Sequence, residues 1–293
     1  MHALESPSSK QIPQTLADAL PAGTGICIIN LDARTDRWDA LQQQVVTHFR
    51  GLELQRISAT AGKGIPGFGK APYFRGRLRD QTWAARGGCV LSHRDALLHA
   101  KSKGWSHLLV LEDDIHINAK PDPDFLSALK DAFESFHFDA CYFGYTDPVP
   151  PSRELIGLGM GRGLHQVFGC NTAHAYLLTA SAIDWILERL PSPSSIWPWL
   201  SRHRAIDRYY SRSLSPAMTV LAVSPSLILQ KPCFSDILGY NVASCRENHR
   251  TGIDPLHPEP RVFQKQMLAR AAACKRLGLV DKARSLWKIL SGL

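Results

Sequence analysis

Short apolar runs alternate along the first half of this chain with stretches in which apolar residues recur every three or four positions. The apolar runs are typical of buried strands, and the recurring pattern is typical of helices with one face against a core. We predict strands at residues 25–30, 52–59, 107–111 and 139–145, and helices at residues 36–49, 88–103 and 125–136. Strands that alternate with helices form a sheet covered by helices. We therefore expect an α/β fold with a Rossmann-type sheet, parallel or mixed.

Composition divides the 293 residues into three regions. Residues 1–23 are polar and rich in Pro and Ser, so we expect a flexible segment there. Residues 24–258 hold the alternating pattern and are numerous enough to bury one large core. Residues 259–293 contain two amphipathic stretches separated at Gly278, which predicts a basic helical hairpin.

Two long glycine-rich segments, residues 60–88 and 146–163, interrupt the pattern and are predicted to be loops. The first contains the glycine spacing of a dinucleotide site and most of a P-loop. However, Pro66 prevents the helix that the former needs, and Ala71 replaces the magnesium-binding hydroxyl of the latter. We expect instead a lid that closes over a bound ligand. Its candidate phosphate contacts are Arg75, Arg77, Arg79 and Arg86.

Charge is concentrated at the carboxyl end of the chain. The net charge is +8, and eight Lys and Arg against two acids give residues 259–293 a net +6. The remainder is nearly neutral, so we do not expect a nucleic-acid-binding protein. Two hypotheses remain for the basic region: it lies on an anionic membrane surface, or it packs on the domain with its charges in water.

Targeting signals are absent from the sequence as given. No apolar run is long enough for a transmembrane helix, and the first residues lack the pattern of a secretory signal. The seven cysteines do not form a disulfide or zinc-binding pattern. We expect a cytoplasmic protein with reduced thiols, placed at the inner membrane face if the basic region binds lipid.

Three consecutive carboxylates, Glu112, Asp113 and Asp114, follow the strand predicted at residues 107–111. Neighbouring carboxylates repel one another unless a cation or water screens them, and open α/β sheets bind ligands at the carboxyl ends of their strands. Carboxylate oxygens suit Mg²⁺ or Mn²⁺, and such an ion neutralises a diphosphate. We predict that Asp114 and Glu112 bind the metal and that Glu112 and Asp113 support the cofactor. The alternative is a solvated acidic turn.

Polar and basic residues also follow the first predicted strand. Asn30, Leu31, Arg34 and Arg37 stand where a strand ends and a helix begins. Such residues could hold a base and a diphosphate. The alternative is a capped helix with exposed arginines.

Ser92 and His93 are adjacent in the helix predicted at residues 88–103. Adjacent residues on a helix diverge, so a nucleophile–base pair is not expected. His93 shares a face with Val90 and Leu97. A packed, hydrogen-bonded histidine is therefore favoured over a catalytic one.

Several short motifs occur in an order that resembles glycosyltransferase family 25, the lipopolysaccharide-type sugar transferases. They lie between residues 25 and 237 and are INLDARTDR (29–37), RISATAG (56–62), GGCVLSH (87–93), VLEDDI (110–115), GCNTAHAYLL (169–178), AID (205–207) and SDI (235–237). The resemblance implies a GT-A fold, a nucleotide-sugar donor that is often UDP-galactose, a divalent metal and inversion at the anomeric carbon. It also adds Ser92 and His93, within GGCVLSH, to the candidate donor-site residues.

The resemblance leads to a functional hypothesis. We expect an inverting glycosyltransferase that moves a sugar, galactose in the first instance, from a UDP-sugar to a saccharide acceptor such as lipopolysaccharide or another glycan. An acceptor hydroxyl must lose a proton as it attacks. Asp207 is the candidate base, and Asp236 is the second choice. The alternative function is a non-catalytic module that binds a sugar nucleotide or an anionic polymer.

Overall fold

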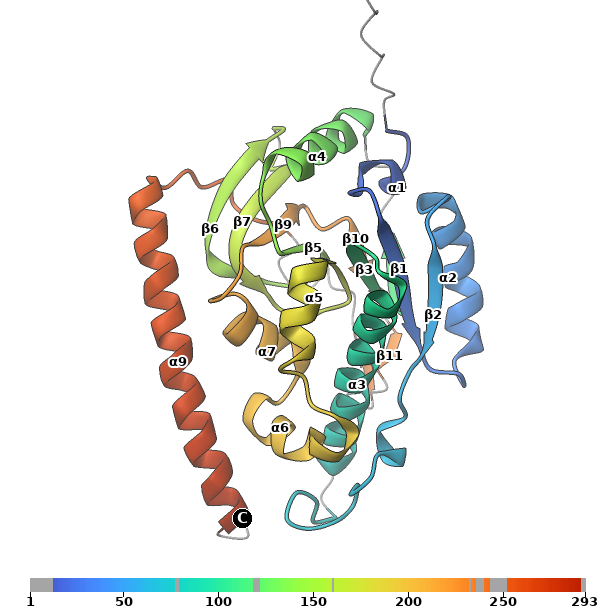
Figure 1. Ribbon diagram of the computed structural model, residues 1–293, viewed down its shortest axis with the longest axis vertical. Coiled ribbons are helices and arrows are strands. Elements are labelled where there is room, and N and C mark those ends of the chain that lie inside the picture. Colours follow the sequence, from blue (N-terminus) through green and yellow to red (C-terminus); the bar gives the residue numbers. More distant parts are fainter. Residues whose placement is uncertain are drawn as a thin grey trace, which may run out of the picture.

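The computed structural model describes residues 13–76, 79–117, 122–159, 161–231, 233–235, 240–242 and 252–290. An eight-stranded sheet forms its centre, in the order β2-β1-β3-β8-β5-β9-β7-β6 (Figure 1). These strands are β1 (Thr24–Asn30), β2 (Leu54–Ser58), β3 (His107–Glu112), β5 (Ala140–Gly144), β6 (Pro148–Gly157), β7 (Gly163–Cys170), β8 (Ala175–Thr179) and β9 (Val220–Ser224). Two small sheets pair β10 (Ile228–Gln230) with β4 (Ile115–Ile117), and β11 (Cys233–Ser235) with β12 (Tyr240–Val242).

Helices cover the sheet and its edges. They are α1 (Leu16–Ala19), α2 (Thr35–His48), α3 (Arg79–Lys103), α4 (Pro123–Ser135), α5 (Ala180–Leu187), α6 (Ile196–His203), α7 (Ile206–Tyr209) and α9 (Pro260–Leu290). Shorter turns are η1 (Gly62–Gly64), η2 (Pro193–Ser195) and η3 (Tyr210–Leu214). The predicted α/β class is confirmed.

The sheet has two buried faces, which explains why its central strands are continuous apolar runs. In β1, Ile26 and Ile28 belong to a core cluster that includes residues of α1, α2 and α4. The alternate residues, Cys27 and Ile29, belong to a second cluster formed with α3, α5, α6 and α7. Successive side chains of a strand point to opposite faces, so one strand contributes to both cores.

The sheet is mixed. β1 pairs in parallel with β2 and β3, whereas β8 runs antiparallel between β3 and β5. The segment at residues 146–163, predicted to be a loop, contains most of a β6–β7 hairpin instead. Its prolines misled the prediction, since β6 is the outermost strand and Pro is tolerated at a sheet edge.

The carboxyl-terminal region is one helix of 31 residues, not the predicted hairpin. Gly278 lies within α9 and does not end it. A glycine inside a helix costs only about 1 kcal/mol relative to Ala, and the contacts of α9 with α6, η3 and β6 offset that cost. In Figure 1, α9 stands beyond β6 along one side of the molecule.

Two further boundaries differ from the prediction. Within the region expected to be flexible, residues 1–23, the described part includes α1, whose Leu16 and Ala19 are buried in the core. Helix α3 begins at Arg79 and so includes part of the predicted loop at residues 60–88. No described helix has the length and apolar character needed to cross a membrane.

Candidate functional site

The carboxyl ends of three parallel strands bring the predicted polar residues together. Asn30 at the end of β1 is in register with Ser58 at the end of β2, and Ile29 is in register with Glu112 at the end of β3. Because these strands run in one direction, the segments that follow them meet at one edge of the sheet. Residues far apart in the sequence therefore form one site.

Asp113 is the centre of a buried polar cluster at this edge. Its Oδ1 is 2.8 Å from Arg37 Nη1, and its Oδ2 accepts a hydrogen bond of 2.7 Å from Asn30 Nδ2. Asn30 Oδ1 accepts bonds of 2.6 and 3.0 Å from Arg56. The side chains of Arg37 and Asp113 are only 12% and 9% exposed. This cluster fixes the segment between β1 and α2 to the end of β3.

The structure places the other residues of the β1–α2 segment as follows. Arg34 pairs with Asp36, whose side chain is exposed, and its backbone N–H bonds the carbonyl oxygen of Leu31 at 2.8 Å. Leu31 is half-buried. The carbonyl oxygen of Arg34 also accepts a bond of 3.1 Å from Asn30 Nδ2, which joins this turn to the cluster.

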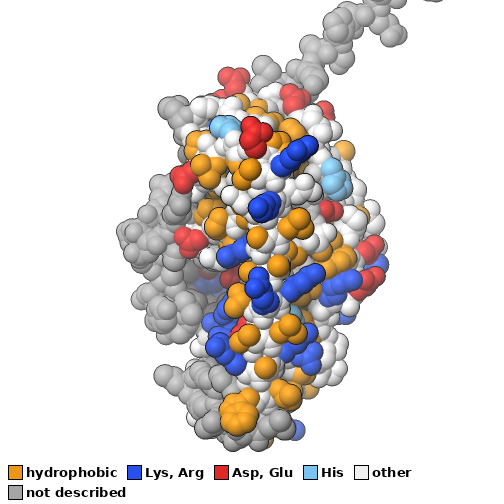
Figure 2. Space-filling model, turned by 90° about the vertical axis from the view of Figure 1, so that its left-hand side faces the viewer, with side chains coloured by type: hydrophobic (Ala, Val, Ile, Leu, Met, Phe, Trp, Pro, Cys, Tyr) orange, Lys and Arg blue, Asp and Glu red, His pale blue; other side chains and the backbone are white. Residues whose placement is uncertain are grey.

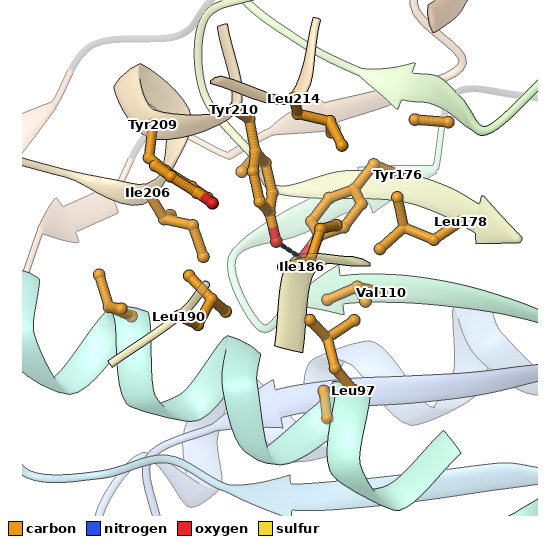
Figure 3. Packing of buried hydrophobic residues seen from close by; sticks show 14 of the residues in the cluster. Leu97, Val110, Tyr176, Leu178, Ile186, Leu190, Ile206, Tyr209, Tyr210 and Leu214 are labelled. Carbon is orange, nitrogen blue, oxygen red and sulfur yellow. Dashed lines mark hydrogen bonds between the residues drawn. The ribbon is translucent and has the colours of Figure 1, made fainter. Parts of the chain in front are cut away.

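Glu112 belongs to a second buried chain of polar groups. Its Oε1 lies 3.2 Å from Nε2 of His93, and His93 Nδ1 lies 2.7 Å from the hydroxyl oxygen of Tyr176. Figure 3 shows how the Tyr176 hydroxyl in turn meets that of Tyr210, at 3.2 Å. His93 is thus a packed, hydrogen-bonded histidine, as expected, and it connects the sheet edge to the interior.

The protonation states of these hydrogen-bonded side chains follow from burial. Burial lowers the pKa of His93 to about 4, so the ring is neutral near pH 7. A neutral imidazole has one N–H and one acceptor nitrogen. When Glu112 is ionised, Nε2 must donate to it, so Nδ1 accepts from the Tyr176 hydroxyl. The Tyr176 oxygen then accepts from Tyr210.

Burial and neighbouring negative charge raise the pKa values of Glu112 and Asp114. Burial, together with Asp113 and Asp207, raises the pKa of Glu112 to about 8. Burial, together with Glu112 and Asp113, raises the pKa of Asp114 to about 7. A bound cation would favour the ionised form of both groups. The pair therefore fits the hard oxygen donors that Mg²⁺ or Mn²⁺ requires.

Asp114 is held by residues that sequence reasoning did not select. Its Oδ2 accepts a bond of 3.1 Å from Gln230 Nε2, and its backbone oxygen accepts a bond of 2.7 Å from the N–H of Lys231. Both follow from the pairing of β10 with β4. Nothing in the sequence near Gln230 indicates this contact. Arg56 was also missed, although it begins the RISATAG motif.

Asp207 lies on α7, which contacts α3. Its negative charge acts on Glu112, His93 and the thiol of Cys89. Its Oδ1 accepts a bond of 2.7 Å from the N–H of Arg208. Of the two predicted bases, Asp207 thus lies within electrostatic range of Glu112. Asp236, the other, lies outside the described residues.

The hydroxyl of Ser92 binds two backbone groups of the protein. Its Oγ donates to the carbonyl oxygen of Gly88 at 2.8 Å and accepts from the N–H of Thr60 at 2.9 Å. Ser92 is 1% exposed. It ties α3 to the segment after β2.

A second set of potential metal ligands shares Glu112. Ligand atoms of Cys89, His93 and Glu112 lie within 4.8 Å of one another. A set with sulfur and nitrogen donors suits zinc better than magnesium. However, burial raises the pKa of the Cys89 thiol well above its ordinary value, and both His93 nitrogens already have partners. Glu112 and Asp114 supply hard oxygen donors and stay the predicted metal ligands.

Comparison with known proteins supplies no family for this chain. No protein-family model matches it, and no curated protein matches its sequence. Among solved structures, it is similar to a Thermus thermophilus protein described as mannose-1-phosphate geranyltransferase. The TM-score is 0.28 and the identity 12%, over 69% of this chain and 73% of that one. A likeness at this level carries no argument about the site, whose chemistry must be inferred from its own residues.

Proposed function

We propose that this chain is a nucleotide-sugar-dependent transferase, and specifically an inverting glycosyltransferase with a UDP-sugar donor. The observation that supports it best is the pair of carboxylates Glu112 and Asp114 at the carboxyl end of β3, where the negative charge of Asp207 also acts on Glu112. Glu112 and Asp114 have raised pKa values, which a bound cation would lower. The resemblance of the motifs to glycosyltransferase family 25 favours galactose as the sugar.

We assign donor binding to residues at the end of β3 and to residues that follow β1. Asp114 and Glu112 would hold Mn²⁺ or Mg²⁺, which when bound stabilises the negative charge that develops on the leaving diphosphate. Arg34 and Arg37 lie on the neighbouring segment and supply positive charge for the nucleotide. Asn30 and Asp113 position Arg37.

Asp207 is assigned the role of base. In the proposed step, its carboxylate takes the proton of an acceptor hydroxyl as that oxygen attacks the anomeric carbon. The bond between that carbon and the β-phosphate oxygen breaks on the opposite face, and UDP leaves with the electron pair. The acceptor is a saccharide, free or linked to lipid.

The test is titration calorimetry of UDP with manganese present. Asp114→Asn should weaken manganese-dependent UDP binding at least tenfold, because it removes a charged ligand. Asp39→Asn, the same substitution at an exposed position of α2, should leave the affinity unchanged. Wild-type affinity in Asp114→Asn would contradict the metal assignment. Binding of UDP-sugars with no UDP release or sugar transfer to any saccharide would favour the non-catalytic alternative.

A further inference from the structure

Helix α9 is attached to the body along one face only. Phe263, Cys274 and Asp281 are 4%, 7% and 8% exposed, and their spacing places them on the same side of the helix. The Asp281 carboxylate forms ion pairs with Arg212 and Arg204 of the body. These contacts fix the helix and determine which side faces outward.

The outward face of α9 exposes large apolar side chains. Seven of the twelve large apolar side chains that are exposed in the described part of the chain belong to this helix. They are between 44% and 67% exposed and are Val262, Leu268, Leu277, Leu279, Val280, Leu286 and Trp287. Figure 2, which views this side, shows hydrophobic side chains along the length of α9. Many exposed apolar side chains on one element mark a surface that contacts a partner or a membrane.

The same face has charge of one sign. Lys and Arg side chains lie among the apolar ones in Figure 2. The exposed ones away from the body are Arg261, Lys265, Lys275, Arg276, Lys282 and Arg284, whereas Arg270 lies over the ring of Phe168 in β7. The acidic residue within α9 is Asp281, and it is buried against the body. The partner of this face must therefore accept apolar side chains and supply negative charge.

We infer that α9 lies flat on an anionic lipid bilayer. A helix of this length extends about 46 Å, which allows contact with many lipid head groups at once. Leucine and tryptophan side chains would enter the boundary between head groups and acyl chains, while Lys and Arg contact phosphates. A second copy using the same face in a two-fold dimer would bring six positive side chains against six more, which disfavours self-association. This inference does not depend on the proposed function.

The experiment is co-sedimentation of the full chain with vesicles. Binding to vesicles containing phosphatidylglycerol should exceed binding to pure phosphatidylcholine at least tenfold, and should fall about tenfold between 0.1 and 0.5 M NaCl. Lys265→Gln with Arg276→Gln should lower the partition coefficient about 30-fold. Leu268→Gln with Leu279→Gln should also release the protein. Val46→Gln, at a position of α2 that is 68% exposed, is the matched control and should bind like wild type.

The residues replaced in the α9 variants are exposed, so the melting temperatures of these variants should equal that of wild type. These melting temperatures are measured in the same experiment. Equal binding to neutral and anionic vesicles, no binding to either, or unchanged binding by both double variants would overturn the inference. Sedimentation velocity is the second measurement. Self-association that the same variants abolish would assign the face to another copy of the chain and would also overturn it. None of these results requires catalytic activity.

Discussion

Replacing Glu112 with Gln should change how the stability of the metal-free protein depends on pH. The folded state raises the pKa of this carboxyl from 4.5 to about 8. Protonated Glu112 therefore stabilises the fold at low pH, and this contribution is lost as the pH rises through about 8. Gln keeps the acceptor oxygen for His93 but does not titrate. Wild type and variant should have similar stability at pH 5.5, and the variant should be more stable at pH 8.5.

The magnitude follows from the size of the shift and the exposure of the group. At about 1.4 kcal/mol for each pH unit, the full difference would reach about 5 kcal/mol. The Glu112 side chain is 23% exposed, so water screens part of this energy. We expect a relative gain of about 2–3 kcal/mol for the variant between pH 5.5 and 8.5.

Urea unfolding in the presence of a chelator, at several pH values, measures this difference directly. The buried histidines titrate in both proteins, so their contributions cancel in the comparison. Manganese should stabilise wild type at pH 8.5 more than the variant, because it replaces the lost protons. A difference that stays constant with pH, or that favours wild type at high pH, would refute the described environment of Glu112.

Two further substitutions test the packing of the site. Asp113→Asn breaks a buried ion pair with Arg37 and should lower the free energy of unfolding by about 3 kcal/mol. Asp36→Asn, at an exposed ion pair, should have little effect. Equal effects of the two substitutions in urea unfolding would contradict the buried cluster. Gly62→Ala would place a Cβ atom 1.8 Å from a backbone oxygen of α3 and should cost about 1–3 kcal/mol, whereas nothing lies within 4 Å of a Cβ at Gly64. Equal melting temperatures for the two alanine variants would show that η1 does not pack closely on α3.

Local patterns in the sequence were sufficient to predict the central strands. The apolar run at residues 107–111 corresponds to β3, and the carboxylates after it are at the predicted edge of the sheet. Asn30 and Arg37 also lie near the triplet, because parallel strands bring their carboxyl ends together whatever follows them. The antiparallel position of β8 between β3 and β5 could not be predicted, since it depends on which strands pair.

Glycine was the main source of error at helix boundaries. Gly88 was interpreted as the start of a helix that in fact begins at Arg79. A Cβ at Gly88 would lie 2.2 Å from the carbonyl oxygen of Thr60, so this glycine allows close packing inside the helix and does not mark its start. Gly278 similarly lies inside α9, where tertiary contacts maintain the helix. The contact of Gln230 with Asp114 could not be predicted, because 116 residues separate them.

The central claim is that Asp207 acts as the base of a sugar transfer. The most direct test measures transfer from a UDP-sugar with manganese, at saturating donor, for wild type and Asp207→Asn. Turnover should fall at least about 100-fold, the usual contribution of a general base. Affinity for UDP should stay within about twofold, since the metal and nucleotide are assigned to other residues. Wild-type turnover in Asp207→Asn would contradict the account.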